Sequence, residues 1–246
     1  MLWRLSTSHP ELFPDPELAE PSGLLAIGGD LTPRRLVAAY CSGIFPWYNT
    51  DSPILWWSPD PRCVIETAGW RPPSRLARTL RSGRFRLTRD RCFARVIRRC
   101  ASIRRVDAEG HDAGGTWLVP EMIEAYERLY DLGLAHSVEA WLEEKGELIL
   151  AGGLYGVELG NVFFGESMFH ERTDGSKAAL AGLVADLAER GIRLLDCQMP
   201  TPHLMRMGAC LLARRDFLAR VQEGTRDIRK SIWLSVNKTS ESPKSA

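Results

Sequence analysis

The most regular pattern of apolar and polar positions in this chain runs from residue 148 to residue 198. Apolar, β-branched and aromatic runs on either side of 158–161 predict two strands joined by a tight turn. A polar loop at 171–175 leads into a helix over 176–190, where apolar residues recur every three or four positions. Ser176 is its expected N-cap, Gly191 follows its end, and a last strand is expected over 192–198.

Two polar clusters interrupt these otherwise apolar strands. Glu166-Ser167-Met168 lies in the second strand and Asp196-Cys197-Gln198 in the last one. A carboxylate or an amide at such a position needs hydrogen-bond partners or a functional role. A satisfied buried network would explain either cluster alone, but two clusters joined through one helix favour a functional site. If the last strand is regular, Cys197 points away from its two neighbours and is a small core residue.

A hairpin and several helices are predicted outside this region. The runs at 135–142 and 148–156 flank the turn EEKGE and should pair as antiparallel strands. A further helix begins at Pro120 and ends before Gly133. Other helices are expected at 36–40, 74–82, 92–100, 202–208 and 216–224, and other strands at 84–90 and 209–214.

The remaining stretches lack such periodicity. Residues 1–60 are rich in Pro, Gly and Trp, and their aromatic side chains either stabilise a small lobe or form a ligand wall. The stretch 103–115 carries charges and glycines without a period, which predicts a loop. The tail after Trp233 is polar and is expected to be disordered. No apolar run is long enough for a signal peptide or a membrane span.

Charge is distributed unevenly, although the formal net charge is only +1. Residues 71–105 hold 13 arginines, no lysine and a single acid, Asp90. The rest of the chain therefore has 19 of the 32 basic residues against 30 of the 31 acids. A basic segment in an acidic body indicates a polyanion site. A solvated basic surface is the alternative, and a GC-rich genome would also favour Arg over Lys.

The spacing of the six cysteines indicates which metal sites, disulfides and cellular compartment to expect. They are scattered without CxxC pairs, which argues against zinc sites and disulfide frameworks and fits free thiols in a reducing cytosol. We therefore expect no metal, no cofactor and a cytoplasmic location. Hydrophobic and charged contents of 44% and 26% are ordinary for a soluble globular protein.

Several short segments, taken in order, resemble the leucyl/phenylalanyl-tRNA–protein transferase family. They cover about residues 10–220 and are GLLAIGGDL (23–31), GIFPWY (43–48), ILWWSPDPR (54–62), GTW (115–117), EAYERL (124–129), AHSVE (135–139), GGLYG (152–156), FGESMF (164–169), SKAAL (176–180), LLDCQ (194–198) and GA (208–209). The resemblance implies an α+β fold, with a small N-terminal domain at 1–62, a GNAT-like (N-acetyltransferase-like) mixed-sheet domain at 63–235 and a disordered tail at 236–246. The strand–strand–strand–helix–strand order predicted over 135–198 agrees with it.

The resemblance also implies an activity and its partners. Enzymes of this family transfer Leu, Phe or less readily Met from aminoacyl-tRNA to the N-terminal Arg or Lys of proteins, which marks those proteins for the N-degron pathway. We therefore expect charged tRNA and basic N-termini as partners, and a monomer that binds no membrane.

Site residues follow from the same resemblance. Glu166, Asp196 and Gln198 would form the catalytic polar centre. The other implied residues are the acyl pocket (Trp47, Leu154, Met168, Leu183, Leu187 and Leu195), the adenosine site (Trp117, Tyr126 and Tyr40) and the tRNA-binding face of the helix at 74–82 (Arg75, Arg78 and Arg81). Leu154, Leu183 and Leu187 depart from the Met and Phe residues expected at their positions.

Two other functions fit parts of the sequence. An acetyl-CoA-dependent N-acyltransferase would bind pyrophosphate on a glycine-rich loop at a helix start, but here that loop reads RTDGSK, with one glycine and an acid. A non-catalytic RNA-binding module would use the basic segment. That function does not require Glu166, Asp196 and Gln198.

Overall fold

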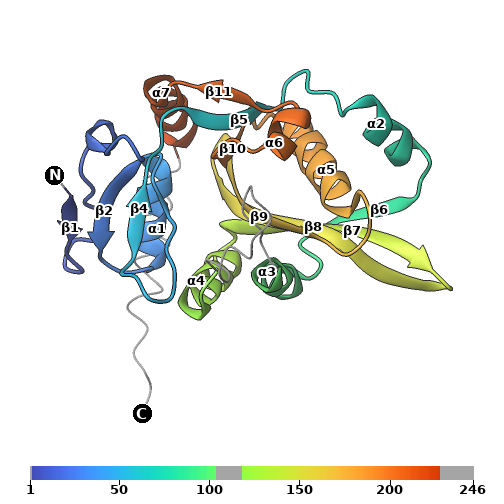
Figure 1. The fold of residues 1–246 in the computed structure, drawn as a ribbon, viewed down its shortest axis with the longest axis horizontal. Coiled ribbons are helices and arrows are strands. Elements are labelled where there is room, and N and C mark those ends of the chain that lie inside the picture. The colour runs from blue at the N-terminus through green and yellow to red at the C-terminus, as the bar shows by residue number, and fades with distance from the viewer. Residues whose placement is uncertain (1, 104–117, 228–246) are drawn as a thin grey trace, which may run out of the picture.

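The computed structural model describes residues 2–103 and 118–227 (Figure 1). Its strands are β1 (Trp3–Leu5), β2 (Leu24–Gly28), β3 (Phe45–Pro46), β4 (Leu55–Trp57), β5 (Arg62–Glu66), β6 (Phe85–Arg89), β7 (Ala135–Glu144), β8 (Glu147–Leu159), β9 (Val162–His170), β10 (Leu194–Gln198) and β11 (Cys210–Leu212). Its helices are η1 (Pro16–Leu18), α1 (Pro33–Cys41), α2 (Ser74–Arg81), α3 (Phe93–Ser102), α4 (Pro120–Asp131), α5 (Gly175–Glu189), α6 (Pro202–Arg206) and α7 (Arg214–Thr225). The expected tail after Trp233 and most of the expected loop at 103–115 lie outside the described residues.

The described strands form two sheets. A four-stranded sheet has the order β1-β2-β4-β3, and a seven-stranded sheet has the order β11-β5-β10-β9-β8-β7-β6. In the larger sheet β9 and β10 are parallel, whereas all other neighbours are antiparallel. The predicted α+β class is therefore confirmed, as is the order of three strands, a helix and a strand over β7 to β10. The other helices and strands predicted from periodicity are present, with ends that differ by a few residues.

The start of α5 departs from the sequence prediction. The helix begins at Gly175, and the residue in the N-cap position is Asp174, with a left-handed φ of 68° and no side-chain cap bond. The prediction that Ser176 caps this helix is wrong. Close packing on β8 explains the difference, because a Cβ at Gly175 would lie 2.2 Å from the carbonyl oxygen of Ala151. The helix start therefore lies directly on the strand and leaves no room for a capping side chain.

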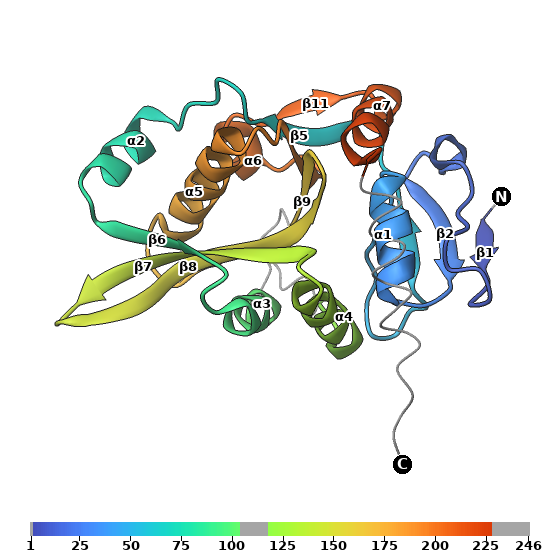
Figure 2. The same ribbon diagram turned by 180° about the vertical axis from the view of Figure 1, so that it is seen from behind.

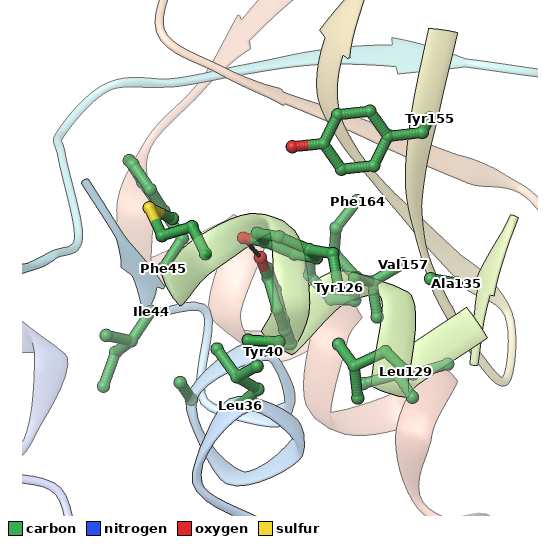
Figure 3. Close-up of a cluster of buried hydrophobic side chains, with 14 of the residues drawn as sticks. Leu36, Tyr40, Ile44, Phe45, Tyr126, Leu129, Ala135, Tyr155, Val157 and Phe164 are labelled. Carbon is green, nitrogen blue, oxygen red and sulfur yellow. Dashed lines mark hydrogen bonds between the residues drawn. The ribbon is translucent and has the colours of Figure 1, made fainter. Parts of the chain in front are cut away.

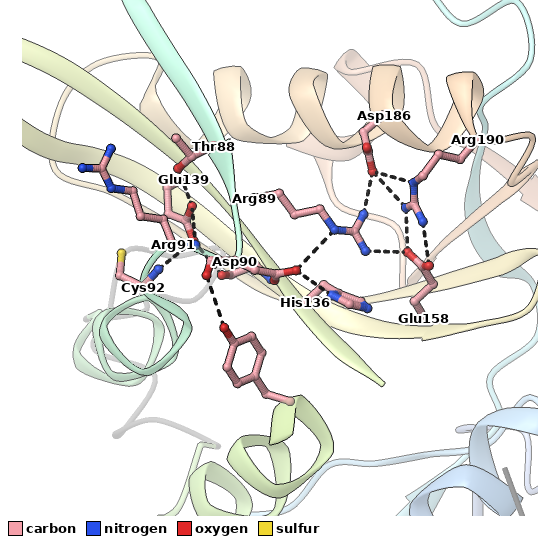
Figure 4. A network of polar contacts seen from close by, with 12 residues as sticks. Thr88, Arg89, Asp90, Arg91, Cys92, His136, Glu139, Glu158, Asp186 and Arg190 are labelled. Atoms are coloured by element: carbon pink, nitrogen blue, oxygen red, sulfur yellow. Dashed lines mark hydrogen bonds and ion pairs between the residues drawn. The ribbon is translucent and has the colours of Figure 1, made fainter. Parts of the chain in front are cut away.

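Helices cover both faces of the larger sheet. α5 and α2 lie on one face of its β6–β9 part, and α3 and α4 lie on the other (Figures 1 and 2). A charged network fastens α5 to the strands (Figure 4). In it Arg89 of β6 donates to Asp186 of α5 at 2.6 Å and to Glu158 of β8 at 2.9 Å, and Arg190 donates to both of these acids. The helix that carries Leu183 is thus held rigidly against the sheet.

The core consists of two clusters, one on each side of the larger sheet. The larger cluster continues from α3 and α4 to α1 and the four-stranded sheet, so the two sheets share one apolar interior (Figure 3). The smaller cluster packs α5 and α6 on the opposite face. Within the described residues, no helix is long and apolar enough to cross a membrane.

Candidate active site

The two polar clusters come together where the parallel strands β9 and β10 separate. Their pairing ends at the register Asp196↔Phe164. Beyond it, Glu166 of β9 and Gln198 of β10 both lie where the pairing register shifts, against β8 in the first strand and against β5 in the second. The amide nitrogen of Gln198 lies 3.1 Å from Oε1 of Glu166, so the two clusters are in direct contact.

Glu166 is enclosed by two tyrosines. The side chain is 9% exposed, and its carboxyl oxygens contact the hydroxyls of Tyr40 at 2.7 Å and Tyr126 at 2.8 Å. The two hydroxyls also contact each other at 2.6 Å (Figure 3). α1 supplies Tyr40 and α4 supplies Tyr126, so the N-terminal lobe and the larger sheet both build this part of the site.

The number of hydrogens available indicates that Glu166 carries a proton in this arrangement. Three oxygen–oxygen contacts require three hydrogens, whereas two phenols supply two. Burial raises the pKa of both tyrosines well above the ordinary value, so both retain their hydroxyl hydrogens. A carboxyl proton on Glu166 completes the ring. Burial also raises the pKa of Glu166 to about 7, and the tyrosine hydrogen bonds only partly offset this effect.

Asp196 is paired with an arginine that the sequence did not identify. Arg62 of β5 contacts the two carboxylate oxygens of Asp196 at 2.8 and 2.7 Å, and both side chains are completely buried. Arg62 also donates to the carbonyl of Gly43 at 3.2 Å, and its guanidinium lies 4.8 Å from the ring of Phe45 and 4.5 Å from that of Phe217. Asp196 therefore faces a fixed buried cation, and its Oδ1 also accepts from the backbone N–H of Gln198.

Gln198 owes its position to an irregularity in β10. The register against β5 shifts between Asp196 and Gln198, and Gln198 has a left-handed φ of 63°. Its backbone N–H donates to Oδ1 of Asp196 at 2.9 Å, which holds this conformation. Because the alternation is broken here, Cys197 and Gln198 line the same cavities. The prediction that Cys197 points away from Asp196 and Gln198 assumed a regular strand, and β10 is not regular at Gln198; Asp196, in contrast, lines neither cavity.

Two adjoining cavities open on this polar centre. The smaller one, of about 90 Å³, is lined mainly by apolar side chains from β8, β9, α5, β10 and α6, with Glu166 and Gln198 at its edge. The larger one, of about 400 Å³, shares Glu166, Met168 and Gln198 and is bordered by Trp47, His170, Thr201 and His203. The two histidines and the threonine had no predicted role. No group of three or more His, Cys, Asp or Glu side chains within the described residues is arranged to hold a metal.

The structure distributes the residues of the expected acyl pocket over different environments. Leu154, Met168, Leu183 and Leu195 line the smaller cavity, together with Leu180 and Leu204. Trp47 lines the larger cavity instead. Leu187 is completely buried in the core and borders neither cavity.

The residues expected to contact tRNA are also separated. Tyr40 and Tyr126 are 0% exposed, so their rings offer no face to a ligand in this structure. Trp117 lies outside the described residues. Arg75, Arg78 and Arg81 are exposed on α2 and form no ion pair with any described residue, while Leu76 on the opposite side of that helix is buried.

Comparison with known proteins gives a consistent result. The sequence profile described as leucyl/phenylalanyl-tRNA protein transferase matches residues 64–222, and the profile of that protein's N-terminal domain matches residues 29–60. A leucyl/phenylalanyl-tRNA–protein transferase from Anaeromyxobacter sp. (strain Fw109-5) is 59% identical over 209 residues, which are 85% of each chain. One from Solidesulfovibrio magneticus is 55% identical over 211 residues, which are 86% of this chain and 82% of the other.

Similarity to solved structures is lower. L-PGS from Bacillus licheniformis gives a TM-score of 0.40 at 8% identity and covers 82% of this chain and 73% of that chain. The profile and the relatives, in contrast, match most of the sequence. On their strength the chain belongs to the leucyl/phenylalanyl-tRNA–protein transferase family.

Proposed function

We propose that this protein transfers leucine, phenylalanine and, less readily, methionine from aminoacyl-tRNA to the N-terminal arginine or lysine of other proteins. The chain belongs to this family, and the observation that carries the proposal is a polar centre, Glu166 and Gln198, at the mouth of a small apolar cavity. The cavity receives the side chain of the transferred residue, and the polar centre receives the two reacting groups. Such transfer would direct the acceptor proteins to the N-degron pathway in the cytoplasm, where the enzyme would act as a monomer.

The reaction joins the acyl carbonyl carbon to the α-amino nitrogen of the acceptor and breaks the ester bond to the terminal ribose. A proton from the amine ends on the released ribose hydroxyl. An α-amino group titrates near 7.7–8.0, so a useful fraction is neutral at cellular pH and needs no strong base. Orientation of the amine then provides much of the rate.

We assign a different role to each polar side chain. The Nε2 group of Gln198 is engaged by Glu166, which leaves the amide oxygen to accept a hydrogen from the attacking amine. Asp196 holds Gln198 through the backbone N–H and is itself fixed by Arg62. Glu166, when ionised, attracts the cationic side chain of the acceptor.

Our proposal for the adenosine site differs from the sequence prediction, because Tyr40 and Tyr126 are completely buried. Trp47, which lines the larger cavity, and Trp117 are our proposed contacts for the terminal nucleotide. Tyr40 and Tyr126 position Glu166 through their hydroxyls and do not stack on the base.

Arg75, Arg78 and Arg81 on α2 contact the acceptor stem. We propose 1–62 as the N-terminal domain and 63–235 as the transfer domain, and the tail 236–246 lies outside the described residues.

An acetyl-CoA-dependent reaction is disfavoured by the start of α5. Backbone N–H groups at a helix start bind pyrophosphate only where phosphate can approach them. Here Gly175 is packed against the carbonyl of Ala151, and Asp174 forms an ion pair with Lys177 at 2.8 Å. A negative group already occupies this end of the helix. A purely RNA-binding role leaves the apolar cavity and its polar edge without a purpose.

The direct test mixes the purified protein with leucyl-tRNA and two peptides that differ only in an N-terminal Arg or Ala. Mass spectrometry should show an added N-terminal leucine on the Arg peptide and none on the Ala peptide. Acetyl-CoA in place of the charged tRNA should give no product. Acetylation without leucine transfer, or binding of RNA with no transfer to either peptide, would overturn the proposed function.

Ionisation of Glu166 gives a prediction about pH. The carboxyl titrates near 4.5 in the unfolded chain and near 7 in the folded protein, so between these values the folded state binds more protons. The free energy of unfolding should therefore fall as pH rises from 4.5 through 7, by up to about 3 kcal/mol. In Glu166→Gln, the side-chain amide supplies the third hydrogen of the ring, so the fall in the free energy of unfolding with rising pH should be absent. Denaturant unfolding at pH 5 and pH 8 would measure this difference.

The same variant tests the role of the charge. In the wild type, KM for the Arg peptide should fall as pH rises through 7, because ionised Glu166 attracts the acceptor. In Glu166→Gln, KM should stay high at every pH, with KM for charged tRNA unchanged. A variant that keeps the wild-type pH dependence of stability, or one whose tRNA KM alone rises, would contradict the assignment.

A further inference from the structure

α3 lies on the face of the sheet opposite α2 (Figures 1 and 2), and it carries several exposed arginines. Arg95 and Arg98 are three residues apart in the helix and so lie on one side of it, and Arg91 precedes the N-cap residue Cys92. All three are exposed, and with Arg99 and Tyr130 they line a surface hollow of about 770 Å³. The feature is therefore a basic concave surface and not a set of isolated charges.

Two of the four arginines that line the hollow form ion pairs with described residues, and both pairs are accessible to water; one of them joins Arg99 to Glu171 at 3.2 Å. Arg91 and Arg95 form no ion pair with any residue that the structure describes, and the guanidinium of Arg91 lies over the ring of Trp141 at 5.3 Å. Arg98 pairs with Glu127 at 2.8 Å, but the Arg98 side chain is 64% exposed, and such a pair in water is weak. The acid nearest in sequence, Asp90, turns inward.

The partners of Asp90 show why it does not compensate these arginines. Its carboxylate accepts from the backbone N–H of Ser137 at 2.8 Å and contacts His136 at 2.7 Å (Figure 4). It also contacts Arg89, which is held in the network around Glu158. Among the described residues that line the hollow, four are arginines and none is an acid.

The position of α3 connects this hollow to the active site. Ile103, which directly follows the helix, lines the larger cavity together with Glu166 and Gln198. A helix of ten residues is about 15 Å long. A strand stacked as in a duplex rises about 3.4 Å per phosphate, so that length corresponds to at most about four nucleotides, and an extended single strand spans it with fewer. A nucleic acid whose 3′ end occupies the larger cavity can therefore reach the hollow within its last few phosphates.

We propose that the hollow formed by Arg91, Arg95 and Arg98 binds the sugar–phosphate backbone of the donor RNA immediately behind its 3′-terminal nucleotide. The inference rests on the proposed function and adds a second RNA contact on the face of the sheet opposite α2. α3 holds the single-stranded end close to the cavity, while the α2 face binds the stem farther away. Arginine suits this task because its planar guanidinium can donate two hydrogen bonds to one phosphate.

The experiment compares two triple variants with the same change in charge. The test variant is Arg91→Gln, Arg95→Gln and Arg98→Gln. The control variant is Arg193→Gln, Arg215→Gln and Arg226→Gln, three exposed arginines outside the hollow that form no ion pair with a described residue. Binding of charged tRNA is measured over a range of salt concentrations, and transfer is measured with leucyl-tRNA and with leucyl-adenosine, which has no phosphate.

Three lost contacts to single-stranded RNA should reduce the slope of log K against log salt by about 2 in the test variant. We also expect KM for leucyl-tRNA to rise at least tenfold at low salt, while KM for leucyl-adenosine remains that of the wild type. The control variant should behave as the wild type with both donors. These results together would support the hollow as an RNA site.

Other results would overturn the inference. An unchanged salt slope would remove α3 from the RNA path. An equal loss with leucyl-adenosine would show that the substitutions disturb the cavity. A change confined to the KM of the acceptor would instead assign the hollow to acidic segments of acceptor proteins. Since RNA binding is measured without transfer, a wild type that fails to transfer leucine would refute the proposed function and leave this test intact.

Discussion

Arg62→Met should lower the free energy of unfolding by about 3–5 kcal/mol and abolish transfer, because it leaves Asp196 as an unpaired buried charge. Arg62 and Asp196 are both 0% exposed, so water cannot take over the lost contacts. The methionine can still pack between Phe45 and Phe217, which limits the loss of apolar contact. Denaturant unfolding at pH 7 and the initial rate of leucine transfer would measure the two effects.

A second variant separates stability from catalysis. In Arg62→Met with Asp196→Leu, both charges are replaced by apolar side chains, a change that is often neutral or stabilising for a buried pair. Most of the lost stability should return. Transfer should not, because the Gln198 backbone N–H has lost the carboxylate that held it at 2.9 Å. A double variant with wild-type kcat would show that the Arg62–Asp196 pair is purely structural, and a stable single variant would refute the energetic argument.

Arg62 also illustrates what the sequence could not reveal. It stands among prolines and polar residues in ILWWSPDPR, where arginines are usually exposed. Its partner Asp196 is 134 residues away and becomes a neighbour only because β5 pairs with β10. Local periodicity has no access to such a contact, and β5 itself is too short to stand out.

The elements that could be predicted are those whose apolar pattern is local. The strands β7, β8 and β9 are apolar runs bounded by turn residues, with β8 buried on both faces from Leu150 to Val157, and α5 has apolar residues every three to four positions. The end of α5 could be predicted from Gly191, but its start could not. It is set by close contact between Gly175 and Ala151, which belongs to tertiary packing.

Part of the candidate site could be predicted from the sequence for a similar reason. Glu166, Asp196 and Gln198 stand out because they are polar residues within apolar strands. Tyr126, in contrast, has the same spacing as the core residues of α4, and nothing local indicates that its hydroxyl meets Glu166. The left-handed φ of Gln198 is likewise invisible, since glutamine carries no preference for it.

Selectivity for the transferred side chain should follow from the smaller cavity. Leu154, Met168 and Leu183 leave about 90 Å³ with an apolar lining, which accepts a side chain that is unbranched at Cβ. A methyl group added at Cβ, as in Val or Ile, would meet the rim beside Glu166 and Gln198. Differences of one methyl group are worth about 1–3 kcal/mol, or 10- to 200-fold. With matched tRNAs, Leu, Phe and Met should therefore transfer at least tenfold better in kcat/KM than Val and Ile.

Two leucines one helical turn apart on α5 provide a matched test of this cavity. Leu183 lines it, whereas Leu187 is completely buried and does not. Leu183→Phe should shrink the cavity and lower the Phe-to-Leu transfer ratio about tenfold or more, with tRNA affinity unchanged. Leu187→Phe adds the same volume to the core, so it should cost about 1–3 kcal/mol of stability and leave the ratio unaltered. If the two variants shift the ratio equally, or if the wild type transfers Ile as well as Leu, the transferred side chain does not occupy this cavity.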